Sequence, residues 1–187
     1  MTECSRYLAE AAGLLSAIEA SGLEAAAAAC IECIDRGGTI FFCGNGGSAA
    51  DSQHFAAELV GRFRKERRPL RALALTENCA SITAIANDYS YEEVFSRQLQ
   101  ALGRAGDMLV AISTSGSSPS VLRALETART MEMGTVAFTG LRGMHFAALA
   151  DAAVVAPAEE SGHVQEVLLA VGHALCSAIE AACGARP

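Results

Sequence analysis

The sequence is poor in basic residues: 14 lysines and arginines stand against 21 aspartates and glutamates, giving a net charge of −7. Nonspecific nucleic-acid binding needs a basic surface, so this balance argues against a nucleic-acid partner. It does not exclude an anionic ligand, because backbone N–H groups can bind phosphate on an acidic protein. Tryptophan is absent and proline occurs four times, while 51% of the residues are hydrophobic, a globular composition. We expect one domain over residues 1–187.

Targeting signals and disulfide patterns are also missing. The first residues, MTECSR, contain neither a basic region nor an apolar run, so no secretory signal is expected. The longest alanine-rich run, residues 25–31, is too short to span a bilayer. Seven scattered cysteines suit a reducing compartment, and Cys30 and Cys33 lie in an apparent helix rather than in a redox motif. The sequence predicts a cytoplasmic protein with no membrane partner.

Short apolar runs alternate with helical stretches through most of the chain. The runs have little polar alternation, which is typical of parallel strands buried on both faces. Such alternation predicts an α/β fold with a five-stranded parallel sheet covered by helices. The expected strands are 39–43, 71–75, 107–112, 134–138 and 152–156, and the expected helices between them are 48–62, 91–102, 118–131 and 144–149.

Additional helices are predicted at both ends of the chain. Residues 2–20 and 22–36 read as two helices before the first strand, and residues 161–183 form a long apolar helix after the last. These helices exceed what a compact α/β core requires. We therefore expect residues 1–36 to pack on other subunits of an oligomer, and residues 37–187 to form the core with its C-terminal helix.

Residues 41–58 are the most informative segment. An apolar strand leads into a glycine-rich turn that opens directly into a helix, an arrangement in which backbone N–H groups and the helix dipole bind anions. His54 and Glu58 are four residues apart on that helix and share one face. An imidazole and a carboxylate can supply acid–base or metal-ligand chemistry, so phosphate binding and proton transfer are predicted side by side.

The glycine turn also admits a second interpretation. Its letters, GNGGSA from Gly44, match the G-x-G-x-x-A fingerprint of dinucleotide folds. That interpretation needs an acidic residue at the end of the second strand. The nearest candidate, Glu77, lies nearly thirty residues beyond the fingerprint, which makes a nucleotide-dependent enzyme the weaker reading.

A second loop carries five hydroxyl groups and a glycine. It runs from Ser113 to Pro119 after a strongly apolar strand, and a helix is expected to start near Ser118. Ligands of open parallel sheets collect at the carboxyl ends of the strands. The loop is either a hydroxyl-rich turn with a capping serine or a second part of a phosphate site. Two such loops on one sheet favour the phosphate site.

Three further groups of residues are candidates for a site. Asn87 and Asp88 follow the segment 81–86, where we expect a loop that caps a helix or holds sugar hydroxyls. On the last helix, Gln165 and His173 lie on one stripe at four-residue steps. The basic run 62–68 reads as a solvated loop. His145 and His163 have no such partners, and no role is assigned to them.

Taken in order, these segments resemble the sedoheptulose 7-phosphate isomerases (phosphoheptose isomerases) of the SIS domain superfamily. The match covers essentially the whole chain. The serine loop alone marks the superfamily, whereas the His-x-x-x-Glu helix combined with Gln165 and His173 is specific to the isomerases. The matching segments are GNGGS from Gly44, HFAAEL from His54, Gly61-Arg62, Ala86-Asn87-Asp88, Gly106-Asp107, STSG from Ser113, Gln165-Glu166 and His173.

The resemblance implies an aldose–ketose isomerase that converts D-sedoheptulose 7-phosphate to D-glycero-D-manno-heptose 7-phosphate, for bacterial surface polysaccharide. It further implies a flavodoxin-like sheet and a homotetramer with active sites at subunit interfaces. Glu58 matches the general base and His173 the general acid. The positions that match substrate and phosphate contacts are Asn45, Gly46, Gly47, Ser48, Glu58, Arg62, Asn87, Asp88, Ser113, Thr114, Ser115, Ser118 and Gln165. Some members bind zinc through the residues that match His54, Glu58, Gln165 and His173.

The chain departs from the family pattern just before Gln165. Many members carry Arg-Ile where this chain has His163-Val164, and some carry Asp at the position of Gly162. Geometry also constrains the implied metal site, because Gln165 and His173 are separated by ~12 Å along a helix. We therefore expect either that they enter a given site from neighbouring subunits or that only one of them ligates tightly.

A noncatalytic interpretation belongs to a different class. A sister group of the isomerases binds the bacterial replication initiator and keeps the glycine loop, so the chain could be a regulator with a protein partner. That group lacks the equivalents of Glu58 and His173, and this chain has both. The sequence favours the isomerase.

Overall fold

The computed structural model describes residues 1–183, and its centre is a five-stranded parallel sheet. The strands are β1 (Ile40–Cys43), β2 (Ala72–Ala74), β3 (Met108–Ile112), β4 (Gly134–Gly140) and β5 (Ala152–Ala156). Their order is β2-β1-β3-β4-β5, and every neighbouring pair is parallel. This is the flavodoxin-like order. The predicted fold class and all five predicted strands are confirmed, with bounds shifted by a few residues.

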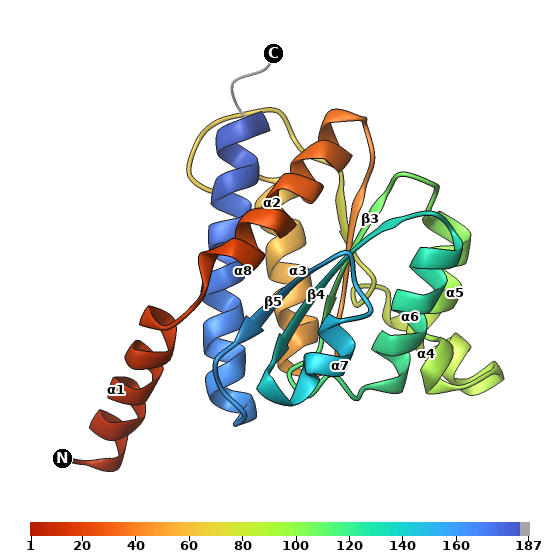
Figure 1. Cartoon of the computed structure of the whole chain (residues 1–187). Helices are drawn as coiled ribbons and strands as arrows, with labels where there is room; N and C mark the ends of the chain where they lie inside the picture. Colours follow the sequence, from red (N-terminus) through yellow and green to blue (C-terminus); the bar gives the residue numbers. More distant parts are fainter. Residues whose placement is uncertain (184–187) are drawn as a thin grey trace.

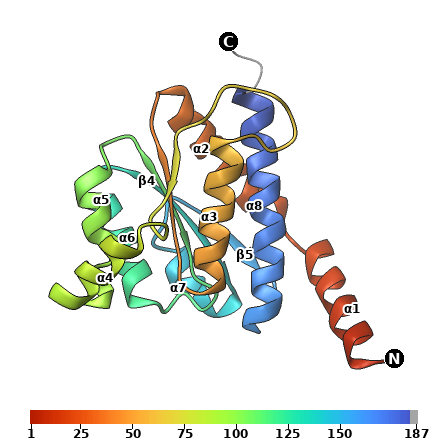
Figure 2. The same ribbon diagram turned by 180° about the vertical axis from the view of Figure 1, so that it is seen from behind.

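Helices cover both faces of the sheet (Figures 1 and 2). The helices α2 (Ala20–Asp35), α3 (Gly47–Val60) and α8 (Ser161–Cys183) pack on one face. The other face is covered by α5 (Ser96–Leu102), α6 (Pro119–Thr130) and α7 (Met144–Ala147), with α4 (Cys79–Asp88) packed outside them. Because successive side chains of a strand alternate between faces, Ile40 and Phe42 enter the first core and Phe41 and Cys43 the second.

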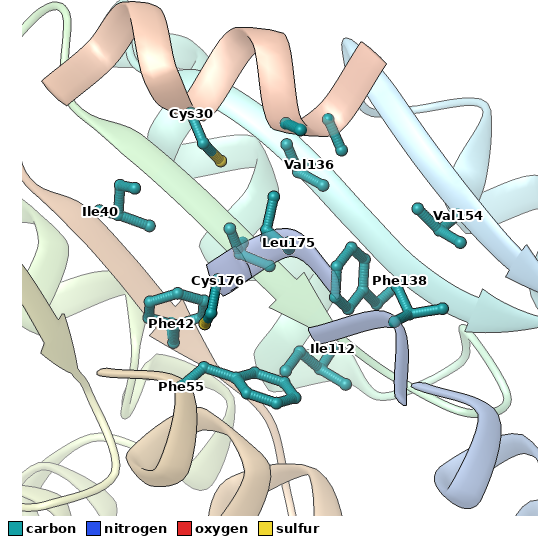
Figure 3. Close-up of a cluster of buried hydrophobic side chains, with 14 of the residues drawn as sticks. Cys30, Ile40, Phe42, Phe55, Ile112, Val136, Phe138, Val154, Leu175 and Cys176 are labelled. Atoms are coloured by element: carbon teal, nitrogen blue, oxygen red, sulfur yellow. The ribbon is translucent and has the colours of Figure 1, made fainter. Parts of the chain in front are cut away.

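The first core joins α3 and α8 tightly to the sheet. Figure 3 shows Phe55 of α3 close to Phe42 of β1, with Leu175 and Cys176 of α8 in the same cluster. The rings of Phe42 and Phe55 lie 6.1 Å apart. Both phenylalanines are fully buried. These contacts fix where α3 and α8 lie on the sheet, and those two helices carry the predicted acid–base residues.

Three of the local predictions are wrong. The first two helices are separated at residues 17–19 and not at 21, because the N-terminal helix ends at Ser16 and α2 begins at Ala20. Residues 91–102 do not form one helix: a 3₁₀ turn, η1 (Tyr91–Glu93), precedes α5, and the Ser96 hydroxyl donates to the Glu93 carbonyl and carboxylate between them. Asn87 and Asp88 do not begin a loop but are the last residues of α4. That helix begins after Asn78, whose side chain caps it by accepting from the Ser81 N–H.

The N-terminal helix α1 (Glu3–Ser16) projects from the body and contacts α8 (Figure 1). The departures from the family pattern lie at this contact: the His163 ring stacks on Tyr7 at 4.2 Å and faces Glu10 at 3.3 Å. A Cβ at Gly162 would lie 2.8 Å from the Tyr7 hydroxyl. His163 and Gly162 therefore serve the docking of α1 in this chain.

Helix α8 is also long and apolar enough to cross a membrane by length and composition. Half of its most apolar stretch is buried inside the protein, and the core helices of many proteins pass the same test. Helices α1 and α2 pass it only as a pair bent by 67°.

Candidate active site

The site begins at the turn between β1 and α3. Gly46 has φ +58°, a left-handed conformation that favours glycine, and it is the N-cap of α3. At Gly44, a Cβ would lie 2.7 Å from the Ser48 Cβ, so glycine is needed for this close turn. The turn directs the first N–H groups of α3 toward the carboxyl edge of the sheet. This edge, between β1 and β3, is the switch point of the strand order, where α/β folds bind ligands.

The serine loop after β3 lies opposite this turn. A cavity of about 150 Å³ separates the two and is lined by Asn45, Ser48, Ile112, Ser113, Thr114, Ser115 and Ser118. Six of these seven residues were predicted to contact substrate or phosphate. Helix α6 begins just beyond Ser118, so the starts of α3 and α6 both adjoin the cavity. Hydroxyl donors and two positive helix ends together suit a phosphate group.

Asn45 fixes the orientation of the hydroxyls in this cavity. Its Nδ2 donates to the Oγ atoms of Ser118 and Ser120, at 2.7 and 3.0 Å. Its Oδ1 accepts from the Tyr91 hydroxyl at 2.8 Å. Ser118 makes no capping bond to its own helix. Ser118 accepts from Asn45, and its hydroxyl lies 3.3 Å from that of Ser120, so its hydrogen can be donated either to Ser120 or to an anion in the cavity.

His54, Glu58 and His173 converge further along α3, and none of the three lines this cavity. The Nε2 atoms of the two histidines are 2.8 Å apart, and His54 Nε2 lies 3.7 Å from Glu58 Oε1. One ligand atom from each of the three residues lies within 4.8 Å of the others. The helix spacing alone placed His54 beside Glu58. Only the packing of α8 against α3 brings His173 to them.

A glycine permits this close packing. Gly172 precedes His173 and faces the ring of Phe55, the residue after His54; a Cβ at Gly172 would lie 1.9 Å from Phe55 Cζ. Glycine at this position therefore allows α3 and α8 to approach closely enough for the two histidines to meet. His173 is enclosed further by Phe63, whose ring is stacked on it at 5.6 Å with an interplanar angle of 16°.

The three converging residues fit a metal ion. Two imidazole nitrogens and a carboxylate are a donor set of catalytic zinc sites, which keep a further position open for a ligand. The two imidazole nitrogens lie at a hydrogen-bond distance of 2.8 Å, so both side chains point toward the same position. Within the described residues, His54, Glu58 and His173 thus form a group that could hold a metal.

Gln165, the fourth implied ligand, has other partners. Its Oε1 accepts from the Ser48 hydroxyl at 3.3 Å, and its Nε2 donates to the Asp51 carboxylate. Burial raises the pKa of Asp51, although the hydrogen bond from Gln165 and the nearby histidines act in the opposite direction. Gln165, on α8, therefore binds two residues of α3, and one of them, Ser48, lines the phosphate cavity.

Three predicted substrate contacts do not line the phosphate cavity. Asn87 and Asp88 hydrogen-bond to each other at 2.8 Å at the exposed end of α4. Arg62 lies exposed in the loop after α3.

Sequence reasoning missed Tyr91, Asp51 and Phe63. The sequence pointed to Phe63 only through its position beside Arg62, a predicted substrate contact, and gave no indication of Tyr91 or Asp51. His145, which was assigned no role, places its Nε2 3.1 Å from the carbonyl oxygen of Gly116 in the serine loop. Cys30 and Cys33 are free and buried, and burial raises their thiol pKa values, which supports the structural interpretation of this pair.

Comparisons with known proteins identify the class of this fold and site. The SIS domain family model matches residues 6–140, so the chain belongs to the SIS domain superfamily. Phosphoheptose isomerases from Paramagnetospirillum magneticum and Rhodospirillum rubrum are 52% and 44% identical to it. These alignments cover 82% and 95% of this chain and 80% and 87% of the relatives.

Solved structures agree with this assignment. The phosphoheptose isomerase from Neisseria gonorrhoeae superimposes with a TM-score of 0.88 at 39% identity, covering 95% of this chain and 97% of that one. Another from Francisella tularensis gives a TM-score of 0.89 at 33% identity, covering 97% and 100%. Within the superfamily, the chain belongs to the phosphoheptose isomerase family.

Proposed function

We propose that this chain interconverts D-sedoheptulose 7-phosphate and D-glycero-D-manno-heptose 7-phosphate. The observation that carries the proposal is that the ligand atoms of Glu58 and His173 lie within 4.8 Å of each other, on the two helices that Gln165 and Ser48 join at the hydroxyl-lined cavity. Family membership supplies the substrate class, and the cavity supplies donors for its phosphate. A noncatalytic regulator has no need for this acid–base pair.

The reaction moves a carbonyl group from C2 to C1 of the sugar. In our proposal the Glu58 carboxylate takes a proton from C1, which gives an enediol, and returns that proton to C2. The O2 atom gains a proton and O1 loses one, and the His173 imidazole can carry that proton between them. Asn45, Ser48 and the serine loop hold the phosphate, which keeps C1 and C2 beside Glu58.

We propose zinc as the cation held by His54, Glu58 and His173, with Gln165 in a supporting position. Such an ion would polarise the sugar oxygens as a Lewis acid. Both polar atoms of the Gln165 amide have partners on α3, Ser48 and Asp51, which supports the expectation that it and His173 do not both ligate tightly.

We further propose a single domain, a homotetramer with active sites at subunit interfaces, and a cytoplasmic location. Helices α1 and α4 contain no buried residues, and Leu8, Leu15 and Tyr89 present exposed apolar surface for neighbouring subunits. The thiols of Cys4, Cys30, Cys33, Cys43, Cys79 and Cys176 are free, in keeping with a reducing compartment. Sedimentation of the purified protein measures its oligomeric state.

The test of the activity is incubation with sedoheptulose 7-phosphate followed by detection of an aldoheptose phosphate. The variant Glu58→Gln is expected to keep phosphate binding and to lose turnover by ~100- to 10,000-fold. Glu126→Gln, on the exposed surface of α6, is the matched control and keeps full turnover. Near-normal turnover in Glu58→Gln would remove Glu58 from the role of base.

Mixing variants tests which subunits build each site. One chain brings Glu58 and His173 together, so a mixture of Glu58→Gln and His173→Ala subunits is expected to remain inactive. Recovered activity would show that these two side chains act from different subunits.

A further inference from the structure

Glu180 is a buried carboxylate that the proposed reaction does not use. Its side chain is 4% exposed, and it lies on α8 seven residues after His173. Seven residues are nearly two helical turns, so both side chains lie on one face of α8, ~10 Å apart along its axis. A buried charge of this kind is costly unless it is paired and hydrogen-bonded.

The loop that follows α3 supplies the partners of Glu180. Its carboxylate accepts four hydrogen bonds from three consecutive backbone N–H groups, those of Phe63, Arg64 and Lys65, at 2.9 to 3.2 Å. The loop after α3 passes over the C-terminal end of α8, where these bonds form (Figure 2). Glu180 therefore fixes the backbone of Phe63, and the ring of Phe63 is stacked on His173.

Arg67 extends the same arrangement to α3. Its Nε lies 3.5 Å from Glu180 Oε1, and its side chain is fully buried. The guanidinium donates to the carbonyl oxygens of Glu58 and Leu59, at 2.7 and 2.9 Å, and to that of Gly61 at 3.2 Å. These carbonyls lie at the C-terminal end of α3, where a cation also interacts favourably with the helix dipole. One end of the Arg67–Glu180 pair is thus tied to the backbone of Glu58.

We propose that Glu180, together with Arg67, is a positioning residue that holds Glu58 and His173 in register. Arg67 fixes the end of the helix that carries Glu58. Glu180 fixes the loop whose Phe63 packs on His173. Arg67 binds the end of α3, and Glu180 belongs to α8. The buried ion pair between them therefore links the two helices that carry Glu58 and His173. The inference rests on the proposed isomerase activity for its kinetic test.

The central experiment compares Glu180→Gln with Asp107→Asn. Asp107 is a matched control because it is also a buried carboxylate, 6% exposed, that accepts backbone N–H groups, those of Thr39 and Arg104. It lies at the amino end of β3, at the opposite edge of the sheet from the site. A merely structural role would give the two variants similar effects.

We expect kcat of Glu180→Gln to fall by ~10- to 100-fold, because displacement of a reacting group by about 1 Å can cost 100-fold. The inhibition constant of inorganic phosphate should change by less than about 3-fold, since the loop is not part of the hydroxyl-lined cavity. The kcat of Asp107→Asn should stay within about 3-fold of the wild-type value. Equal losses of kcat in the two variants, or none in Glu180→Gln, would overturn the proposal.

Two further measurements test the proposal if Glu180→Gln folds poorly or if the enzyme acts on another substrate. Phe63→Leu keeps an apolar side chain but removes the stacking, and it should lower kcat; combined with Glu180→Gln, the effects should be less than additive. Calorimetry with Zn²⁺ should show ~10- to 100-fold weaker binding in Glu180→Gln and unchanged binding in Asp107→Asn. A normal kcat in Phe63→Leu, or normal Zn²⁺ binding in Glu180→Gln, contradicts the role.

If the wild-type protein does not isomerise sedoheptulose 7-phosphate while the Zn²⁺ measurement behaves as expected, the proposed function fails and the positioning role stands.

Hydrogen exchange adds a readout that needs neither substrate nor metal. The N–H groups of residues 63–65 should exchange faster in Glu180→Gln than in Asp107→Asn. Unchanged protection there would show that Glu180 does not hold the loop.

Discussion

Replacing Gly172 by alanine tests whether close packing of α3 and α8 builds the site. The new Cβ would lie 1.9, 2.2 and 2.5 Å from three atoms of the Phe55 ring. Ordinary van der Waals contact begins near 3.4 Å, so the ring and α8 must separate by roughly 1.5 Å. Phe55 is fully buried in the first core, so the ring has little room to move aside.

The energetic consequence follows from two opposing effects. Overpacking of a core typically costs ~1–3 kcal/mol, and alanine in place of a helical glycine returns up to ~1 kcal/mol. A net loss of about 1–2 kcal/mol is expected, which lowers Tm by ~2–4 °C per kcal/mol in a chain of this size. The catalytic loss should be larger. His54 is adjacent to Phe55 and His173 is adjacent to Gly172, so the two histidines separate when the ring and α8 separate, and kcat is expected to fall by ~100-fold.

Thermal unfolding and steady-state kinetics measure both effects. Gly13→Ala is the matched control, because Gly13 is also a helical glycine and its Cβ would meet no atom within 4 Å. That variant should be as stable as the wild type or slightly more so, with unchanged kcat. A Gly172→Ala protein with wild-type Tm and kcat would refute the claim that this glycine sets the distance between the histidines.

Three other predictions concern the phosphate site, the buried carboxylate and the thiols. Ser118→Ala removes a hydroxyl donor to a charged group and should raise KM ~10- to 100-fold with little change in kcat; an unchanged KM would exclude contact with the phosphate. Burial raises the pKa of Glu180, but the amides of residues 63–65 and Arg67 outweigh it and hold that pKa below its usual range. Its stabilisation is therefore present above the ordinary glutamate pKa of 4.5 and is lost as pH falls through the folded-state value, so the Tm difference between wild type and Glu180→Gln should narrow on acidification. Alkylation should modify only the exposed Cys4 and Cys79 in the native protein and all seven cysteines after unfolding, as counted by mass spectrometry; early modification of further thiols would contradict the packing.

The chain's own patterning determined the fold class and much of the site. Continuous apolar runs at five places are sufficient to predict a parallel sheet, because strands buried on both faces cannot carry polar residues on alternate positions. The glycine turn at Gly44 and the hydroxyls from Ser113 follow strands directly, so their meeting at one edge of the sheet could be foreseen. The pairing of His54 with Glu58 follows from helical periodicity alone.

Tertiary packing decided the rest. His173 is 119 residues from His54, and no periodicity connects them; they meet because Gly172 lets α8 lie against Phe55. The sequence predicts that the basic run 62–68 is a solvated loop. Arg67 of this run is nevertheless buried, because it forms an ion pair with Glu180, two turns beyond His173 on α8. Local sequence patterns fix which face a side chain occupies within its own element. The distance between two elements depends on the volumes and polar partners of side chains far apart in the chain, and here those side chains form the site.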